Sequence, residues 1–243
     1  MSSNESLSPD MMLKEGAAVF SAELDDKKLQ QLAKYKELLM EWNQKINLTA
    51  IEEENEILVK HFIDSFSIIP FLKTANTRLI DVGTGAGFPG IPVKIACEAA
   101  EVVLLDSLAK RVSFLNIVIN ELALANITAV HGRAEEFGVK PEYREKFDIS
   151  VARAVAALPV LLEYCLPFVK VDGFFIAMKG SSTEEVSGSQ KALDRLGGKI
   201  EEVKEFVLPF SDIKRNIIIV RKFRQTPTAY PRKAGKPAKE PLI

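Results

Sequence analysis

Residues 79–90 read Leu-Ile-Asp-Val-Gly-Thr-Gly-Ala-Gly-Phe-Pro-Gly, and this stretch decides the fold. Its pattern is that of a short apolar strand ending in Asp81, then a glycine-rich turn, then the start of a helix. A backbone that lacks side chains at the glycines lets a ligand approach closely. Because α/β proteins place nucleotide-like cofactors where a strand enters a helix through such a turn, the stretch predicts a cofactor site.

The chain that follows alternates strands and helices, which favours a parallel sheet covered on both faces. We expect strands at 78–81, 102–106, 127–131, 147–152 and 173–178, and helices at 91–99, 110–124, 158–169 and 183–196. Two further strands, 199–208 and 216–223, have no helix between them and should form an antiparallel pair. An α/β, Rossmann-like sheet that ends in an antiparallel hairpin resembles the class I methyltransferase fold more than a dehydrogenase.

A small helical region precedes the sheet. Its apolar residues recur at helical spacing, at Leu24, Leu29, Leu32, Tyr35, Leu38, Leu39 and Trp42. Residues 47–49 break this pattern, and Thr49 fits the N-cap of a second helix that includes 57–66 and ends near Pro70. We therefore divide the chain into a helical region at 1–75, a cofactor-binding domain at 76–225 and a basic, proline-containing tail at 226–243.

Composition limits the function classes. The chain has 243 residues, 47% of them hydrophobic, and a net charge of −1, so any nucleic-acid partner must be held by a local basic patch. Cys97 and Cys165 are far apart in apolar patterns, which fits buried core residues and no metal site. With no apolar run of transmembrane length and a polar start, we expect a soluble, cytoplasmic protein.

The glycine turn can be interpreted in two registers. Residues 85–90 fit the G-x-G-x-x-G pattern of an NAD site, with Asp106 about 20 residues on as the ribose-binding acid. In the other register, Asp81 stands two residues before the alternating glycines Gly83, Gly85 and Gly87, which is typical of S-adenosylmethionine enzymes. An acid at the strand tip can hold the cofactor's ammonium group, whereas it would repel a pyrophosphate. The second register is therefore favoured.

Two neighbouring loops supply further candidates. Asp106 ends the second strand, where it can accept hydrogen bonds from ribose hydroxyls; the plainer interpretation is an N-cap for the next helix. Residues 131–136 follow the third strand and should pass beside the adenine. There the backbone near Ala134, or the Glu135 carboxylate, can meet the exocyclic amine, although a solvated turn is as good an interpretation of the same residues.

The chain from about residue 24 onward resembles the bacterial RsmG (GidB) family. The resemblance rests on motifs that occur in order: Asn-Leu-Thr at 47–49, His-Phe-Ile-Asp-Ser at 61–65, the turn at 81–90, Asp-Ser-Leu-Ala-Lys-Arg at 106–111, Gly-Arg-Ala-Glu-Glu at 132–136, Ala-Arg-Ala-Val at 152–155, Lys-Gly at 179–180, Arg-Asn at 215–216 and Tyr-Pro-Arg-Lys-Ala-Gly-Lys-Pro at 230–237. Each motif is weak by itself, and their combination is specific.

The resemblance implies an enzyme that transfers a methyl group from S-adenosyl-L-methionine to N7 of a guanine in 16S rRNA, in the 530-loop region of the small ribosomal subunit. It places cofactor contacts at Gly83, Phe88, Ala134, Glu135 and Arg153. The fold argument adds Asp81, Gly85, Gly87 and Asp106 to this cofactor site. No metal is implied, and the enzyme is expected to be a monomer.

The chemistry of guanine N7 agrees with what the sequence lacks. N7 carries a lone pair and no proton, so catalysis can come from alignment and exclusion of water, without a general base. The fourth strand runs into 149–154 without the Asn/Asp-Pro-Pro-Tyr signature of amine methylation. A Pro-Cys nucleophile for carbon methylation is also missing, since Tyr164 precedes Cys165.

Arg153, at the tip of the fourth strand, is the candidate catalytic residue. It would orient the cofactor or an RNA phosphate; the plainer interpretation is an ion pair with a nearby acid. His61 and Asp64 could line the substrate side, although a packing histidine is the more ordinary role. RNA phosphates would be held by Arg215, Arg232, Lys233 and Lys236, with Lys110, Arg111 and Lys239 as further candidates.

Two alternatives of other classes stay open at this point. One is an NAD(P)-binding oxidoreductase that uses Gly85, Gly87 and Gly90. The other is a catalytically silent RNA-binding module that has kept the fold. The sequence leaves open whether naked rRNA, a precursor particle or the mature subunit is the substrate.

Overall fold

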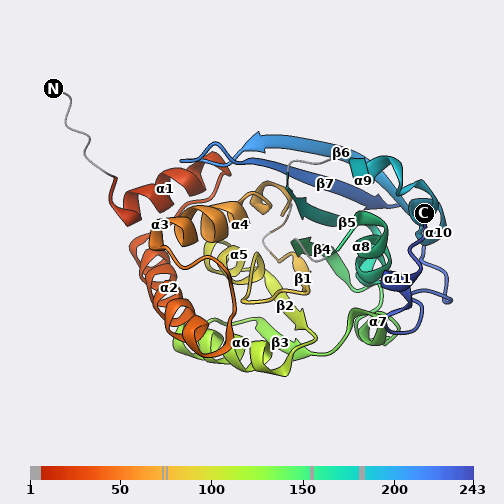
Figure 1. Ribbon diagram of the computed structural model, residues 1–243, viewed down its shortest axis with the longest axis horizontal. Helices are drawn as coiled ribbons and strands as arrows, with labels where there is room; N and C mark the ends of the chain where they lie inside the picture. Colours follow the sequence, from red (N-terminus) through yellow and green to blue (C-terminus); the bar gives the residue numbers. More distant parts are fainter. Residues whose placement is uncertain (1–6, 73, 75, 154–155, 181–183) are drawn as a thin grey trace.

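The computed structural model describes residues 7–72, 74, 76–153, 156–180 and 184–243. In this part of the chain the centre is a seven-stranded sheet with the order β3-β2-β1-β4-β5-β7-β6 (Figure 1). The strands are β1 (Arg78–Val82), β2 (Glu101–Asp106), β3 (Ile127–His131), β4 (Phe147–Arg153), β5 (Val169–Lys179), β6 (Gly198–Val207) and β7 (Lys214–Lys222).

The pairing confirms the predicted α/β, Rossmann-like sheet. Strand β1 pairs in parallel with β2 and β4, β2 with β3, and β4 with β5. Strand β7 is antiparallel to both of its neighbours, β5 and β6, so the expected terminal hairpin is present. Since β1 to β4 run in one direction, their carboxyl ends meet at one edge of the sheet, where such folds bind ligands.

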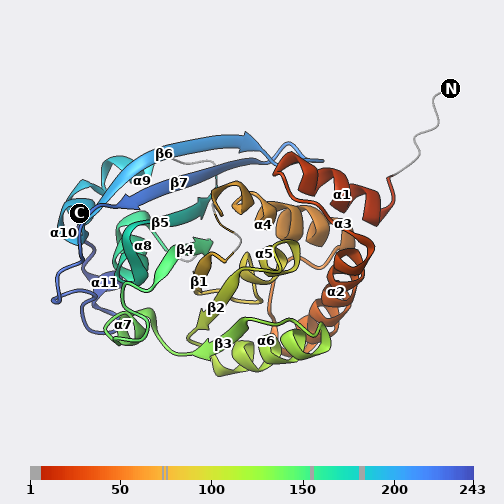
Figure 2. The same ribbon diagram turned by 180° about the vertical axis from the view of Figure 1, so that it is seen from behind.

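Helices cover both faces of the sheet (Figures 1 and 2). One face carries α1 (Pro9–Val19), α2 (Asp26–Ile46), α3 (Glu54–Ile57), α4 (Asp64–Phe66), α5 (Gly90–Ala96) and α6 (Ala109–Glu121). The other side carries α7 (Ala134–Phe137), α8 (Leu158–Cys165), α9 (Glu184–Ser187), α10 (Gln190–Leu196) and α11 (Lys236–Lys239). Alternate residues of β1 belong to the two hydrophobic cores: Leu79 to the core that includes residues of α2 and α5, and Ile80 to the core that includes residues of α8 and α10.

The predicted stripe of α2 is its buried face. Leu32, Tyr35 and Leu39 are fully buried, and the Asp25 carboxylate caps the helix by accepting a hydrogen bond from the Lys28 N–H. The hydroxyl of Tyr35 donates to the carbonyl of Ala86 at 2.5 Å, inside the glycine turn. The helical region thus shares one hydrophobic core with the sheet. The division into three domains stays a prediction, and residue 75, at its first boundary, lies outside the described residues.

The expected N-cap at Thr49 is wrong. Helix α3 is capped by Glu53, whose carboxylate accepts a hydrogen bond from the Glu56 N–H. Thr49 has other partners, because its hydroxyl accepts from the Ile51 N–H and lies 2.9 Å from His61 Nε2. The helix predicted at 57–66 is also not uniform: a π-helical turn, η1 (Leu58–Ile63), separates α3 from α4.

Several predicted boundaries differ from the structure. The expected helix at 158–169 ends at Cys165, continues as a 3-10 turn, η3 (Leu166–Phe168), and gives way to β5, which starts before the predicted 173. Pro167 and the apolar run around it explain the error, because such runs fit helices and strands alike. Helices α5 and α6 end three residues before their predicted 99 and 124.

The helix predicted at 183–196 is divided into α9 and α10, with Gly188 and Ser189 between them; its first residue, Thr183, lies outside the described residues. A second 3-10 turn, η2 (Ile69–Phe71), closes the helical region at Pro70. None of the helices in the described ranges is long and apolar enough to cross a membrane.

Candidate functional site

The glycine turn after β1 is held in place by hydrogen bonds to β2. The N–H of Gly83 donates to the Leu105 carbonyl at 2.8 Å, and the N–H of Gly85 donates to Asp106 Oδ2 at 2.9 Å. Gly87 has a φ of 106°, and a Cβ there would lie 2.7 Å from the Tyr35 hydroxyl, so only glycine fits. The turn therefore has one fixed shape at the carboxyl ends of β1 and β2.

Asp81 lies fully buried beneath this turn. Its Oδ2 accepts hydrogen bonds from the Thr84 hydroxyl at 2.7 Å and from the Gly90 N–H at 2.9 Å. Its Oδ1 has no partner among the described residues, and burial raises the pKa of Asp81 to about 6. Asp81 thus holds the turn in place through hydrogen bonds from Thr84 and Gly90. A cofactor contact by its unpartnered oxygen stays a prediction.

A pocket of about 280 Å³ opens at the carboxyl ends of these strands. We call it the cofactor pocket, and its lining is Val82, Gly83, Leu105, Ser107, Gly132, Arg133, Ala134, Glu135, Ala156, Leu161, Tyr164 and Ala238. Three of the predicted cofactor residues are therefore brought together: Gly83 from the turn after β1, and Ala134 and Glu135 from the start of α7. Tyr164 of α8 and Ala238 of α11 were not predicted.

One carboxylate, Glu135, is part of the pocket lining, and a second, Asp106, lies in the chain between the lining residues Leu105 and Ser107. Asp106 is almost fully buried; its Oδ1 accepts from the Leu108 N–H and its Oδ2 from the Gly85 N–H. Helix α6 has no side-chain cap, so Asp106 ties the turn to the following loop rather than capping that helix. Glu135 is also buried, and its Oε1 accepts a hydrogen bond from the Gly235 N–H at 2.8 Å, in the C-terminal segment.

Phe88 lies on the other side of the turn, where it is buried in an aromatic stack. Its ring centre lies 4.4 Å from the ring centre of His61 and 5.3 Å from that of Tyr35, and the ring planes are nearly parallel. The Arg153 guanidinium carbon lies 5.0 Å from the Phe88 ring centre. Phe88 is 4% exposed and is not part of the pocket lining, so its contact with a cofactor stays a prediction.

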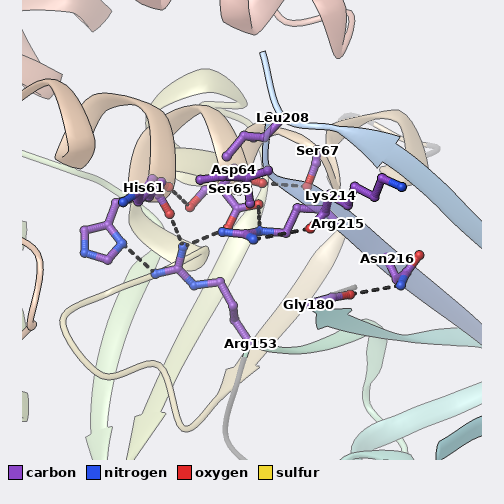
Figure 3. A network of polar contacts seen from close by, with 12 residues as sticks. His61, Asp64, Ser65, Ser67, Arg153, Gly180, Leu208, Lys214, Arg215 and Asn216 are labelled. Atoms are coloured by element: carbon purple, nitrogen blue, oxygen red, sulfur yellow. Dashed lines mark hydrogen bonds and ion pairs between the residues drawn. The ribbon is translucent and has the colours of Figure 1, made fainter. Parts of the chain in front are cut away.

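Arg153, at the end of β4, is the centre of a polar network (Figure 3). Its Nη1 donates to the Lys60 carbonyl at 3.1 Å and to Asp64 Oδ2 at 3.4 Å. The other oxygen of Asp64 accepts from Arg215 Nε at 3.1 Å, so one buried carboxylate serves two guanidinium groups. The ion pair considered for Arg153 therefore exists. The motif residues after it, Ala154 and Val155, lie outside the described residues.

His61 is the third partner of Arg153. Its Nδ1 lies 3.1 Å from Arg153 Nη2 and can only accept there, which leaves Nε2 to donate to the Thr49 hydroxyl. Burial and the nearby guanidinium lower the pKa of His61 to about 3. The imidazole is therefore neutral, and its two nitrogens have fixed roles. His61 and Asp64, which the sequence places on one helical face, are thus part of one network with Arg153.

A second pocket, of about 330 Å³, lies against this network. We call it the basic pocket, and its lining is Ile51, Lys60, His61, Asp64, Arg153, Met178, Lys179, Gly180 and Arg215. Four cationic side chains and the Asp64 carboxylate line it, and Glu56 and Glu185 are paired with Lys60 and Lys179. Four cations against three carboxylates leave one positive charge in excess, which favours an anionic ligand. Lys60 was not predicted. Lys179 and Gly180 stood only in the Lys-Gly motif at the end of β5.

The other predicted basic residues lie apart from this pocket. Lys110 donates to the Ile46 carbonyl, and Arg111 lies 3.6 Å from the Asp106 carboxylate. Arg232 binds the buried Glu163 carboxylate through its guanidinium, whereas Lys233, Lys236 and Lys239 are exposed on the C-terminal segment. In the described part of the chain, no three His, Cys, Asp or Glu side chains gather where they could hold a metal ion.

Comparison with solved structures identifies the fold. A methyltransferase described as putative from Bacillus halodurans is 16% identical, with a TM-score of 0.52 over 66% of this chain and 99% of that chain. TYW2 of M. jannaschii, solved in complex with AdoMet, is 16% identical with a TM-score of 0.50 over 64% of this chain and 72% of that one. At such identities the likeness concerns the fold alone, which is the class I methyltransferase fold.

Closer relatives are found by sequence. The ribosomal RNA small subunit methyltransferase G of Acetivibrio thermocellus is 67% identical over 95% of this chain and 96% of the relative. The protein of the same name from Alkaliphilus oremlandii is 55% identical over 95% of this chain and 98% of the relative. The family model described as rRNA small subunit methyltransferase G matches residues 28–218. On this match and these identities, the chain belongs to the GidB family, the rRNA small subunit methyltransferase G proteins.

Proposed function

We propose that this protein transfers a methyl group from S-adenosylmethionine to N7 of a guanine in 16S rRNA, within the 530-loop region of the small ribosomal subunit. The observation that carries the proposal is the cofactor pocket, where Gly83, Ala134 and Glu135 meet at the carboxyl ends of parallel strands in a family of rRNA methyltransferases. The cytoplasm, where small subunits are found, is its proposed place of action.

The hydrogen bonds of the glycine turn fit S-adenosylmethionine better than a dinucleotide. In the G-x-G-x-x-G register, amides of the turn should point at a pyrophosphate. Here the N–H groups of Gly85 and Gly90 are both donated to carboxylates, those of Asp106 and Asp81. Two buried acids so close to the turn would repel a pyrophosphate. This arrangement argues against the NAD(P)-dependent oxidoreductase.

The pocket residues suggest how the cofactor would be held. Asp106, in the chain between the lining residues Leu105 and Ser107, would accept a ribose hydroxyl in addition to its bonds from Gly85 and Leu108. Glu135 can accept the adenine amine, because its Oε2 is not engaged by a hydrogen bond within the described ranges. When bound, S-adenosylmethionine supplies an electrophilic methyl group on its sulfonium. Gly83, Gly85 and Gly87 have no side chains, so the cofactor can lie close to the backbone of the turn.

The protein needs no base for this reaction. Guanine N7 presents an in-plane lone pair without a proton, so the barrier falls when that lone pair is aligned with the methyl group and water is excluded. His61 is neutral and has a partner on each nitrogen, and burial raises the pKa of the Cys165 thiol. Neither residue is set up for proton transfer or nucleophilic attack. Arg153 would act by orienting its neighbours at the cofactor's edge.

The basic pocket is the proposed entry for RNA. Arg215, Lys60 and Lys179 line it together with Arg153, and all four can meet phosphate oxygens. The exposed Lys233 and Lys236 are further candidates on the C-terminal segment; for Arg232 an RNA contact would compete with its bond to Glu163. RNA affinity should therefore fall steeply with salt.

One experiment tests the proposal. The protein is incubated with labelled S-adenosylmethionine and small subunits that lack the modification, and the labelled nucleoside is identified and mapped. We expect 7-methylguanosine at one position of 16S rRNA. Label at another atom or in another RNA would contradict the proposed target, and binding of NAD without S-adenosylmethionine would favour the oxidoreductase. RNA binding without any labelling would favour a silent module.

Oligomeric state is a separate part of the proposal. We propose that the protein works as a monomer. Light scattering during size-exclusion chromatography checks this, and a dimer mass would contradict it.

A further inference from the structure

The C-terminal segment, residues 226–243, closes one side of the cofactor pocket. Ala238 of α11 is part of the pocket lining, although it is more than a hundred residues from Glu135 in the same lining. The segment is not a free basic tail: Leu242 is buried in the second core, and Lys191 Nζ donates to the Ile243 carbonyl. The C-terminal segment is therefore packed against the rest of the protein beside the pocket.

Arg232 and Glu163 supply that attachment. Glu163, on α8, is fully buried, and its two carboxylate oxygens accept from Nε and Nη2 of Arg232 at 2.6–3.0 Å. The backbone N–H of Arg232 donates to the same carboxylate at 2.8 Å. A bidentate arginine–carboxylate pair of this kind fixes orientation as well as position. Glu163 also precedes Tyr164, which lines the pocket from the same helix.

The attachment leads directly to Glu135. Three residues beyond Arg232, the N–H of Gly235 donates to Glu135 Oε1 at 2.8 Å. This bond leaves Oε2 as the oxygen without a partner among the described residues, at a pocket lined by Gly83 and Ala134. A carboxylate held through one oxygen presents the other in a fixed direction.

We propose that the C-terminal segment is part of the cofactor site: Arg232 and Glu163 are positioning residues that hold Gly235 on Glu135 and Ala238 against the bound adenosine. This inference rests on the proposed function for the identity of the cofactor. It gives the segment a task that does not depend on RNA. Arg232 then serves cofactor binding, whereas Lys236 and Lys239, exposed on the same segment, would serve RNA; for Lys236 this contact would compete with its ion pair to Glu240.

The sharpest test uses two neighbouring exposed positions. In Ala238→Trp, the indole would enter the cofactor pocket, whereas in Lys239→Trp it would stand outside the pocket lining. Affinity for S-adenosylmethionine is measured by calorimetry on the full chain without RNA. We expect the Kd to rise about tenfold or more for Ala238→Trp and to change less than about twofold for Lys239→Trp. Equal Kd values for both variants and the parent would overturn the inference.

A second set of variants tests the attachment. Arg232→Ala should raise the Kd and the KM for S-adenosylmethionine about tenfold, because the segment would no longer hold Gly235 on Glu135 and Ala238 at the pocket. Its KM for small subunits should stay near the parental value, and Arg232→Lys should recover part of the affinity. Lys236→Ala should leave cofactor affinity unchanged. A merely structural Arg232 would lower thermal stability without this separation of the two KM values, and that result would contradict the proposal.

The two levels of the argument fail in different ways. If the parent protein does not bind S-adenosylmethionine at all, the proposed function is wrong. If the parent binds it, while Ala238→Trp and Arg232→Ala bind it equally well, only the role of the C-terminal segment is wrong.

Discussion

Two buried aspartates near the carboxyl edge of the sheet, Asp81 and Asp64, are stabilised in different ways. Asp81 accepts from a hydroxyl and a backbone N–H, both within nine residues along the chain. Asp64 is paired with two guanidinium groups, of Arg153 and Arg215, that lie 89 and 151 residues away. Burial raises the pKa of both carboxyls. At Asp64 the two guanidinium groups oppose this effect, whereas at Asp81 the hydrogen bonds from Thr84 and Gly90 oppose it more than the charge of Arg153 does.

The difference shows two ways of building one site. The cofactor side is made from local turns that parallel strands bring to one edge. The basic side is made by a charged network that exists only when the N-terminal helices, β4 and β7 are all in place. Each side should therefore respond in its own way to substitution, pH and salt.

The largest effect is expected for Asp64→Ala. Removal of the shared carboxylate leaves two guanidinium groups, themselves mostly buried, without their common partner. Breaking a buried ion pair from one side costs ~3–5 kcal/mol of unfolding free energy. Urea unfolding measures the loss. The matched control is Glu98→Ala, which breaks the exposed pair with Lys27 and should cost at most ~1 kcal/mol. Similar losses for the two variants would show that the network contributes no more than a surface pair.

The next effect concerns pH. The folded pKa of Asp81 is about 6, against an ordinary 3.8, so between these values the folded protein holds a proton that the unfolded chain has released. The free energy of unfolding should therefore fall as pH rises from about 4 to about 6, by roughly 3 kcal/mol in total, and then level off. Asp81→Asn should lack this decline. Urea unfolding at several pH values checks it, and parallel profiles for parent and variant would contradict the assignment.

A smaller loss of unfolding free energy is expected for a substitution at Gly90, where α5 begins close to β1 and β2. A Cβ at Gly90 would lie 2.3 Å from Leu104 Cδ2 and 3.0 Å from Asp81 Oδ2, so Gly90→Ala should cost ~1–3 kcal/mol through overpacking. Gly180→Ala is the control, because a Cβ there meets nothing within 4 Å. Thermal unfolding compares the two, and a neutral Gly90→Ala would mean that the turn yields more easily than its contacts suggest.

The smallest effects separate the two pockets. Glu135→Ala should weaken S-adenosylmethionine binding about tenfold and leave RNA binding unchanged. Arg215→Ala should do the reverse: RNA affinity falls, and the slope of log affinity against log salt decreases in magnitude by about 1. Titrations of both ligands at three salt concentrations measure this. If each variant lowered the affinities for S-adenosylmethionine and for RNA equally, the two pockets would behave as one binding site.

Much of the fold could be predicted from the sequence, because its signals are local. The acid before the glycines, the alternating elements and the paired final strands are visible as patterns, and the sheet confirms them. Gly83, Ala134 and Glu135 could be placed because strand ends in a parallel sheet converge. Where the rules compete, prediction was wrong: Thr49 fits an N-cap by its residue type, but its hydroxyl binds His61 instead.

The remaining parts of the site depend on contacts that no local pattern encodes. Nothing near Ala238 indicates that it reaches the cofactor pocket, since that placement follows from the pairing of Arg232 with Glu163, 69 residues apart. The pairing of Asp64 with Arg153 and Arg215 likewise joins residues far apart in the sequence. Arg232 was predicted to contact RNA from the charge and the prolines of its segment, and neither distinguishes a side chain that faces RNA from one that faces a buried acid.

The reversed direction of β7 has a consequence for where new side chains can be recruited. In a sheet of parallel strands, only residues that follow a strand arrive at the carboxyl edge. Because β7 runs against β5, with Asn216 opposite Lys179, the residues that begin β7 arrive there too. Arg215 reaches the basic pocket by this route. An antiparallel strand thus lets residues after the end of one strand and residues at the start of another contribute to the same site. More positions of the chain can therefore be selected for that site.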